Sequence, residues 1–216
     1  MPAAGLLHRP WGGPAPTTLH WVSELPGGGT VRPITRWGKP VMHRVLRPVQ
    51  AFDDELAALV ADLVATMRAA DGVGLAANQI GIDRAVFVFD CPDKDRVRHT
   101  GVVCNPRLVL PQGDDRTLDE GDEGCLSMPG AFVPCARTDH ARVEGVDQTG
   151  VPVAYEGEGL VARCLQHETD HVFGTVFGDR VNAKQRKVLH RQADEFADLF
   201  PPDWPVTPER ALDDAG

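Results

Sequence analysis

The chain has 216 residues and a mass of 23.4 kDa, which is enough for one hydrophobic core and favours a single catalytic domain. Its residues are 42% hydrophobic, and no apolar run approaches the length of a membrane span. A net charge of −9 argues against a protein whose main function is to bind nucleic acid, because phosphate binding needs a basic surface. We therefore expect a soluble protein with no membrane partner and no specific nucleic-acid partner.

The first residues contain neither the apolar stretch of a secretion signal nor the pattern of an organelle transit peptide, so we expect a cytoplasmic location. The five cysteines are an odd number, which favours reduced thiols over a disulfide framework. A cysteine with a special role should then bind metal or act in catalysis.

Residues 1–30 are rich in proline and glycine and lack sustained periodicity, so we expect an N-terminal extension without a catalytic role. An amphipathic helix is predicted from Asp53 to Gly72, because acidic residues open it, glycine closes it and apolar residues recur along one face. That face consists of Leu56, Leu59, Val60, Leu63, Val64 and Met67.

The segment 72–81 is broken by glycines, which predicts a loop, and residues 85–90 have the density of valine and phenylalanine typical of a buried strand. Short strands are predicted at 101–110, 141–147 and 150–156. The last two are expected to form a hairpin.

Two further helices are predicted, at 159–174 and at 183–200, the second with an apolar face of Val188, Leu189, Phe196 and Leu199. Residues 201–216 are rich in proline and acidic residues and are expected to form a flexible tail. Strands that precede helices indicate an α+β fold, with the catalytic domain at 31–200.

The strongest local signal is the pair His167 and His171, which lie four residues apart and therefore on one face of a helix. Two imidazoles in this arrangement can share one metal ion. Glu168 is offset by about 100° from His167, so it reaches a metal-bound water rather than the ion itself. That is the position of a general base.

The alternative is a surface helix with scattered polar residues. Apolar neighbours make this helix hydrophobic nearly all round: Leu160, Val161, Cys164, Leu165, Val172 and Phe173. Burying two histidines and a carboxylate without partners would cost several kcal/mol, and metal coordination with supporting hydrogen bonds offsets that cost. We therefore favour a metal site.

A catalytic metal usually has three protein ligands, so one more residue is needed. A metzincin would place a third histidine where this chain has Phe177, which excludes that class. A thermolysin-like enzyme would use a later glutamate, for which Glu195 is the candidate. An upstream cysteine is the third alternative, and Cys125 stands in a loop-like segment. The remaining cysteines are expected to be small buried hydrophobes: Cys91, Cys104, Cys135 and Cys164.

Three motifs occur in order along the chain: GVGLAANQ at 72–79, EGCLS at 123–127 and QHETDH at 166–171. Together they resemble the peptide deformylase family, and the resemblance covers roughly three quarters of the chain. It implies antiparallel β-sheets around a central metal-binding helix, with an N-terminal and a C-terminal helix. Asn78 is a departure, because the family usually has proline there, which would stiffen the loop.

The resemblance implies an enzyme that removes the N-formyl group from the N-terminal formylmethionine of newly synthesised polypeptides and releases formate. It assigns Cys125, His167 and His171 to one divalent metal ion and favours Fe²⁺, with Ni²⁺ or Co²⁺ as working substitutes. The ligand types alone, a thiolate with two imidazoles, suit Zn²⁺. Glu168 is the implied general base, and the amide of Gln79 and the backbone N–H of Leu126 are the implied donors to the oxyanion.

A pocket for the methionine side chain is expected beside the metal helix, lined by Leu160, Cys164 and His167 on one face, with Arg163 off that face. Val73, Gly74 and Gly124 complete the predicted substrate-binding residues. Gly74 would let the substrate backbone approach closely.

Asp170 is expected to orient its neighbours rather than react, with Arg137 as its partner. The second C-terminal helix begins with a basic cluster: Lys184, Arg186, Lys187 and Arg191. Our hypothesis is that this cluster makes a transient contact with the ribosome near nascent formylmethionyl peptides. A non-catalytic member of the fold is disfavoured, because no ligand or base position is lost.

Overall fold

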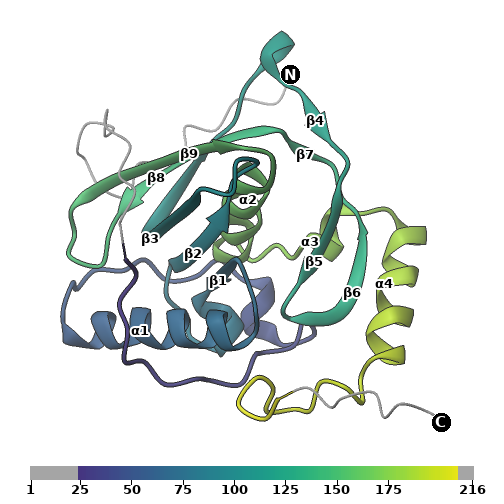
Figure 1. Ribbon diagram of the computed structural model, residues 1–216, viewed down its shortest axis with the longest axis horizontal. Coiled ribbons are helices and arrows are strands. Elements are labelled where there is room, and N and C mark those ends of the chain that lie inside the picture. Colours follow the sequence, from purple (N-terminus) through teal and green to yellow (C-terminus); the bar gives the residue numbers. More distant parts are fainter. Residues whose placement is uncertain (1–23, 209–216) are drawn as a thin grey trace.

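The computed structural model describes residues 24–208, and a five-stranded antiparallel sheet is its largest element (Figure 1). The sheet order is β1-β2-β3-β8-β9. Its strands are β1 (Gly74–Ala76), β2 (Val86–Pro92), β3 (Arg98–Val109), β8 (His140–Val146) and β9 (Pro152–Glu158). The smaller pairs are β4 (Leu118–Asp119) with β7 (Arg137–Thr138) and β5 (Asp122–Cys125) with β6 (Met128–Pro134).

Four α-helices and three short 3₁₀ helices are found within residues 24–208. They are α1 (Asp54–Ala69), α2 (Gly159–Val172), α3 (Phe177–Arg180), α4 (Ala183–Glu195), η1 (Pro40–His43), η2 (Ala77–Ile80) and η3 (Gly113–Asp115). In Figure 1 the strands surround α2, which lies near the centre of the molecule. The predicted α+β fold is confirmed. Within the same residues, no helix is long and apolar enough to cross a membrane.

The large sheet is covered by a different helix on each face. Val86 and Val88 of β2 belong to the hydrophobic cluster of α1, whereas Phe87 and Phe89 belong to that of α2. Successive side chains of a strand point to opposite faces, so a strand buried on both sides is apolar throughout. This explains the continuous apolar run that predicted the strand.

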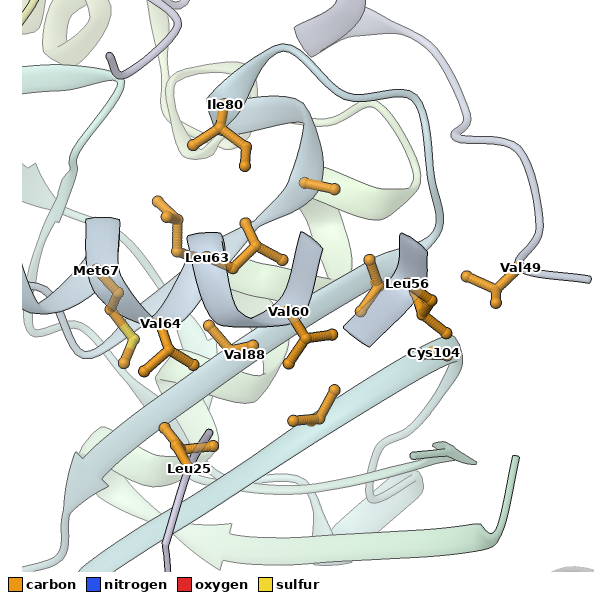
Figure 2. Close-up of a cluster of buried hydrophobic side chains, with 14 of the residues drawn as sticks. Leu25, Val49, Leu56, Val60, Leu63, Val64, Met67, Ile80, Val88 and Cys104 are labelled. Atoms are coloured by element: carbon orange, nitrogen blue, oxygen red, sulfur yellow. The ribbon is translucent and has the colours of Figure 1, made fainter. Parts of the chain in front are cut away.

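Helix α1 begins at the acidic residues that the sequence places at its start, and Asp53 caps it. The side chain of Asp53 accepts a hydrogen bond from the backbone N–H of Leu56 at 3.1 Å, which satisfies a donor at the helix start. The predicted face packs onto the sheet (Figure 2). Leu63 in its middle is fully buried, whereas Leu59 at its edge is only partly buried.

Replacing Leu63 with alanine should lower the free energy of unfolding by about 2–5 kcal/mol, because the lost methyl groups leave a cavity in a close-packed core. Urea unfolding followed by circular dichroism measures this. Leu59→Ala is the matched control and should cost less, since its side chain is already partly in water. Equal losses for both variants would contradict the packing described for α1.

The hairpin that leads into α2 is confirmed. β8 and β9 pair from Val146 opposite Pro152 to His140 opposite Glu158, around a turn in which the N–H of Gly150 donates to the carbonyl of Asp147. The following helix is buried over all residues 161–172, charged side chains included. The sequence-based expectation of a helix buried nearly all round is therefore correct.

Three expectations need correction. Residues 72–81 are not only a loop, since they contain β1, which pairs with β2 from Gly74 opposite Phe89 to Ala76 opposite Phe87, and η2. The last helix ends at Glu195 rather than at residue 200. Cys125 ends strand β5 instead of lying in a loop.

The predicted flexible tail is packed where it is described. Trp204 is buried, and its carbonyl accepts a hydrogen bond from the N–H of Ile34 at 2.9 Å. Residues 209–216 of that tail and residues 1–23 of the predicted extension lie outside the described range. Leu25, from the described part of the extension, is buried in the cluster of α1.

Candidate metal centre

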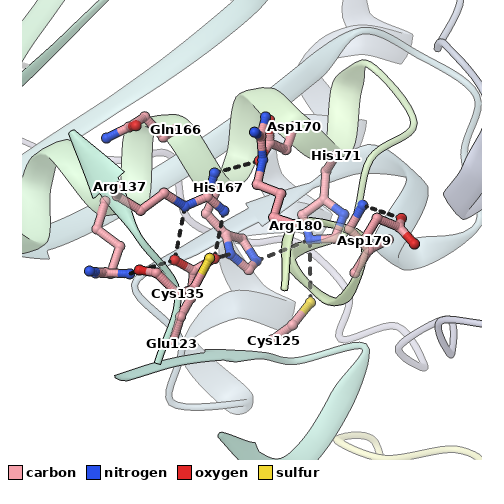
Figure 3. A network of polar contacts seen from close by, with 12 residues as sticks. Glu123, Cys125, Cys135, Arg137, Gln166, His167, Asp170, His171, Asp179 and Arg180 are labelled. Atoms are coloured by element: carbon pink, nitrogen blue, oxygen red, sulfur yellow. Dashed lines mark hydrogen bonds and ion pairs between the residues drawn. The ribbon is translucent and has the colours of Figure 1, made fainter. Parts of the chain in front are cut away.

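Strand β5 and helix α2 bring three potential metal ligands together. Cys125 stands at the end of β5, and His167 and His171 lie one turn apart on α2. Nε2 of His171 is 3.3 Å from Sγ of Cys125 and 3.2 Å from Nε2 of His167 (Figure 3). All three side chains are buried, and their ligand atoms lie within 4.8 Å of one another.

These distances fit a first-row metal ion. Bonds of about 2.0–2.1 Å to nitrogen and about 2.3 Å to sulfur put tetrahedral ligand atoms roughly 3.3–3.5 Å apart. Nδ1 of His167 lies 2.8 Å from Oε1 of Glu123, a contact that assigns the ring proton to Nδ1 and leaves the Nε2 lone pair facing the group. Glu195 is exposed and is not part of the group, so the thermolysin-like alternative is excluded.

Glu123 is the residue that sequence reasoning missed. Its carboxylate accepts hydrogen bonds from Arg137 at 2.6 and 3.0 Å and from Arg163 at 2.8 Å. Burial favours the neutral acid, but the hydrogen bonds from Arg137 and His167 outweigh it and hold the pKa of Glu123 well below its usual value. The available signal was its position two residues before Cys125, which in a regular strand is the same face.

Asp170 has the predicted partner. Nη1 of Arg137 lies 2.6 Å from Oδ2 of Asp170, and the guanidinium of Arg180 contacts the same carboxylate. Arg137 therefore bridges Asp170 on α2 to Glu123 on β5, as Figure 3 shows. The charges of this buried network alternate, which keeps each one paired and fixes the strand carrying Cys125 against the helix carrying the histidines.

Glu168 lies beside the ligand group and lines the same cavity. Its side chain is buried, Oε2 has no hydrogen-bond partner among the described residues, and burial raises the pKa of the carboxyl to about 7. A Cβ at position 74 would come within 2.5 Å of Oε1 of Glu168. Gly74 is therefore required by this carboxylate, a reason that the sequence interpretation did not supply.

The two expected oxyanion donors lie next to the ligands. Oε1 of Gln79 accepts from the N–H of Ala76 at 2.8 Å, which turns Nε2 toward Cys125 Sγ at 3.7 Å and Ser127 Oγ at 3.5 Å. Leu126 directly follows Cys125 in the turn between β5 and β6.

Asn78 fixes the segment of η2 through a side-chain contact. Its Nδ2 donates to the backbone carbonyl of His171 at 2.9 Å, and the residue is fully buried. This hydrogen bond ties the segment of Gln79 directly to helix α2. The segment is thus held by an amide contact rather than by the fixed φ that the expected proline would impose.

A cavity of about 490 Å³ opens onto the ligand group. All of the predicted substrate-binding residues line it: Val73, Gly74, Gly124, Leu160 and Cys164. Arg163 also lines it, so the expectation that Arg163 lies off this face is wrong. The reason is helical geometry, because Arg163 precedes His167 by four residues and therefore shares its face.

A buried group of one cysteine and two histidines, with an adjacent carboxylate and an open apolar cavity, defines the class of metal-dependent hydrolases. The family model described as polypeptide deformylase matches residues 31–187, and the chain belongs to this family. It is therefore a hydrolase of the peptide deformylase type, as the three sequence motifs predicted.

Relatives that are named peptide deformylases agree with this family assignment. The chain is 52% identical to peptide deformylase 1 of Streptomyces avermitilis, over 80% of each protein. It is 50% identical to peptide deformylase 2 of Streptomyces coelicolor, over 78% of this chain and 93% of the relative. A crystal structure of a peptide deformylase from Legionella pneumophila has a TM-score of 0.69 at 36% identity, covering 78% of this chain and 96% of that one.

Proposed function

We propose that Cys125, His167 and His171 hold one divalent ion, natively Fe²⁺, at which the chain hydrolyses the formyl amide of N-formylmethionyl peptides to formate and a free amino terminus. The observation that carries the proposal is the convergence of these ligand atoms beside Glu168 and Gln79 on one cavity. The family is metal-dependent, and thiol and imidazole ligands suit several first-row ions.

Solved relatives support the choice of substrate. The peptide deformylase of Synechococcus elongatus, described in complex with actinonin, has a TM-score of 0.67 at 33% identity, covering 82% of this chain and 91% of that one. A deformylase of Acinetobacter baumannii, described with Met-Ala-Ser bound, has a TM-score of 0.63 at 29% identity, covering 70% and 99%. By this likeness, Val73, Gly124, Leu160 and Cys164 would receive the methionine end of a formylated peptide.

A bound metal ion would polarise the formyl oxygen and lower the pKa of a water molecule. Glu168 would take a proton from the attacking water and return it to the amine nitrogen as the C–N bond breaks. The amide of Gln79 and the N–H of Leu126 would stabilise the negative charge on the former carbonyl oxygen. Burial excludes bulk water from the carboxylate, which keeps its pKa within reach of neutral pH.

Removing the proposed oxyanion donor tests one part of this mechanism. Gln79→Ala should lower kcat by about 10²- to 10³-fold with little change in metal content, because one preorganised donor to an oxyanion is lost. Single-turnover kinetics with formyl-Met-Ala-Ser measure the chemical step. Gln50→Ala, which changes an exposed amide, is the control and should leave kcat unchanged. If kcat of Gln79→Ala fell by less than threefold, Gln79 would not be an oxyanion donor.

The identity of the ion is tested by reconstitution. Protein prepared without oxygen and loaded separately with Fe²⁺, Zn²⁺, Ni²⁺ or Co²⁺ should deformylate formyl-Met-Ala-Ser, fastest with Fe²⁺ and with Ni²⁺ and Co²⁺ as working substitutes. Metal content is measured on the same samples, so that rates are compared per bound ion. A Zn²⁺ form that is faster than the Fe²⁺ form would contradict the assignment of iron.

The basic cluster at the start of α4 supports a second proposal, a transient contact with the ribosome in the cytoplasm, where nascent formylated chains emerge. Lys184, Arg186, Lys187 and Arg191 are all exposed, and Arg186 also donates from Nε to the carbonyl of Gly178 at 2.9 Å. Co-sedimentation with ribosomes should weaken as salt rises and should be reduced in a Lys184→Ala, Lys187→Ala variant. Salt-insensitive binding, or none, would overturn it.

A further inference from the structure

One wall of the cavity lies beyond the part of the chain that the family model matches. Phe200 and Trp204 line the cavity, whereas the family match ends at residue 187. We call these two side chains the C-terminal wall. Trp204 falls in the predicted tail, which therefore contributes to the site.

The C-terminal wall is fixed by contacts from a segment distant in sequence. Nη2 of Arg36 donates to the carbonyls of Phe200 and Pro201, each at 3.1 Å, and its guanidinium lies 5.9 Å from the ring centre of Trp204. The N–H of Ile34 donates to the carbonyl of Trp204 at 2.9 Å. The rings of Phe200 and Trp204 meet edge to face at 5.1 Å. The wall is therefore a built part of the cavity.

The same segment also holds the catalytic loops. The N–H of Thr35 donates to the carbonyl of Gln79 at 2.8 Å, and the N–H of Trp37 donates to the carbonyl of Ser127 at 3.1 Å. Residues 34–37 thus connect the C-terminal wall to the loops that carry the proposed oxyanion donors. These backbone hydrogen bonds set the position of the C-terminal wall relative to Gln79 and Leu126.

The chemistry of the wall is apolar. Leu126, Phe200 and Trp204 pack on one hydrophobic cluster, and Phe200 is only partly buried, so part of its ring is available to the cavity. The expected methionine pocket, at Leu160 and Cys164 on α2, lines another part of the same cavity. An apolar ligand group that covers exposed aromatic surface gains free energy from the area removed from water.

We propose that the C-terminal wall is a subsite for an apolar side chain of the peptide residue one or two places after formylmethionine. The inference rests on the proposed deformylase function and adds a substrate preference to it. A peptide whose formyl group reaches the ligand group and whose methionine occupies the α2 pocket continues along the rest of the cavity. The apolar lining there includes Met128, Pro129 and Phe132 of β6 and the C-terminal wall, and of these only the C-terminal wall lies outside the family match.

The test compares kcat/KM for formyl-Met-Ala-Ser, formyl-Met-Leu-Ser and formyl-Met-Ala-Leu in the full-length metal-loaded enzyme. Wild type should prefer at least one leucine peptide by about tenfold, and Phe200→Ala should abolish that preference while retaining turnover of formyl-Met-Ala-Ser. Trp204→Phe, which keeps an aromatic ring in place, should retain most of the preference. Val206→Ala is the matched control, since Val206 is an exposed residue of the same segment that does not line the cavity.

The outcomes separate failure of the subsite from failure of the deformylase function. Equal rates for all three peptides in wild type would overturn the subsite, and so would an equal loss on every peptide in Phe200→Ala, which indicates a purely structural role. A preference that Val206→Ala also abolishes would overturn it as well. Failure of wild type to release formate from any of the peptides would instead overturn the deformylase function on which the inference rests.

Discussion

Glu168→Gln should lower kcat for formyl-peptide hydrolysis by about 10²- to 10⁴-fold while the metal stays bound, because a positioned general base is lost and no ligand is changed. The side chain is buried beside the ligand group and has space there only because residue 74 is glycine. Glutamine has nearly the same shape, so the cavity should keep its form. Formate release measures activity, and elemental analysis measures bound metal.

The matched control for this variant is Glu158→Gln, which makes the same change at an exposed position before α2. It should leave both kcat and metal content unchanged. If Glu168→Gln kept more than a tenth of wild-type kcat, or if it lost the metal, Glu168 would not be the base. The second result would place its carboxylate among the ligands.

Cys125→Ala should lose the metal ion and with it all measurable formate release. The sulfur lies 3.3 Å from Nε2 of His171 and is the only non-histidine member of the ligand group found within residues 24–208. Alanine leaves two imidazoles, one fewer than the three protein ligands of a catalytic site. Metal content after dialysis, followed by activity, measures the effect.

Two controls separate this role from general damage. Cys135→Ala removes another buried thiol, outside the ligand group, and should retain the metal. Glu195→Ala should also retain it, because the carboxylate is exposed at the end of α4. Metal retained by Cys125→Ala and lost by Glu195→Ala would instead support a zinc endopeptidase.

The parts of the site that could be predicted are those with a local signature. His167, Glu168 and His171 follow from helical spacing in an apolar segment. Cys125 had no such signature, since one cysteine among five resembles a small buried hydrophobe. Its selection depended on the family resemblance.

Contacts distant in sequence explain what could not be predicted. Residues 74–76 form a strand because residues 87–89 provide a partner strand. The local sequence of residues 74–76 does not predict this pairing. Arg36 and Phe200 are 164 residues apart, so their hydrogen bond and the cavity wall it fixes have no sequence pattern. The position of Arg163 was predictable, since its spacing from His167 is the same as that between the two histidine ligands.

The most direct test of the central claim is formate release from formyl-Met-Ala-Ser by anaerobically prepared, iron-loaded protein, run beside unformylated Met-Ala-Ser. We predict one formate and one free amino terminus for each peptide consumed, with both peptide bonds intact and with no reaction of the unformylated peptide. Cleavage at a peptide bond, or an unchanged formyl-peptide after long incubation with metal bound, would contradict the account.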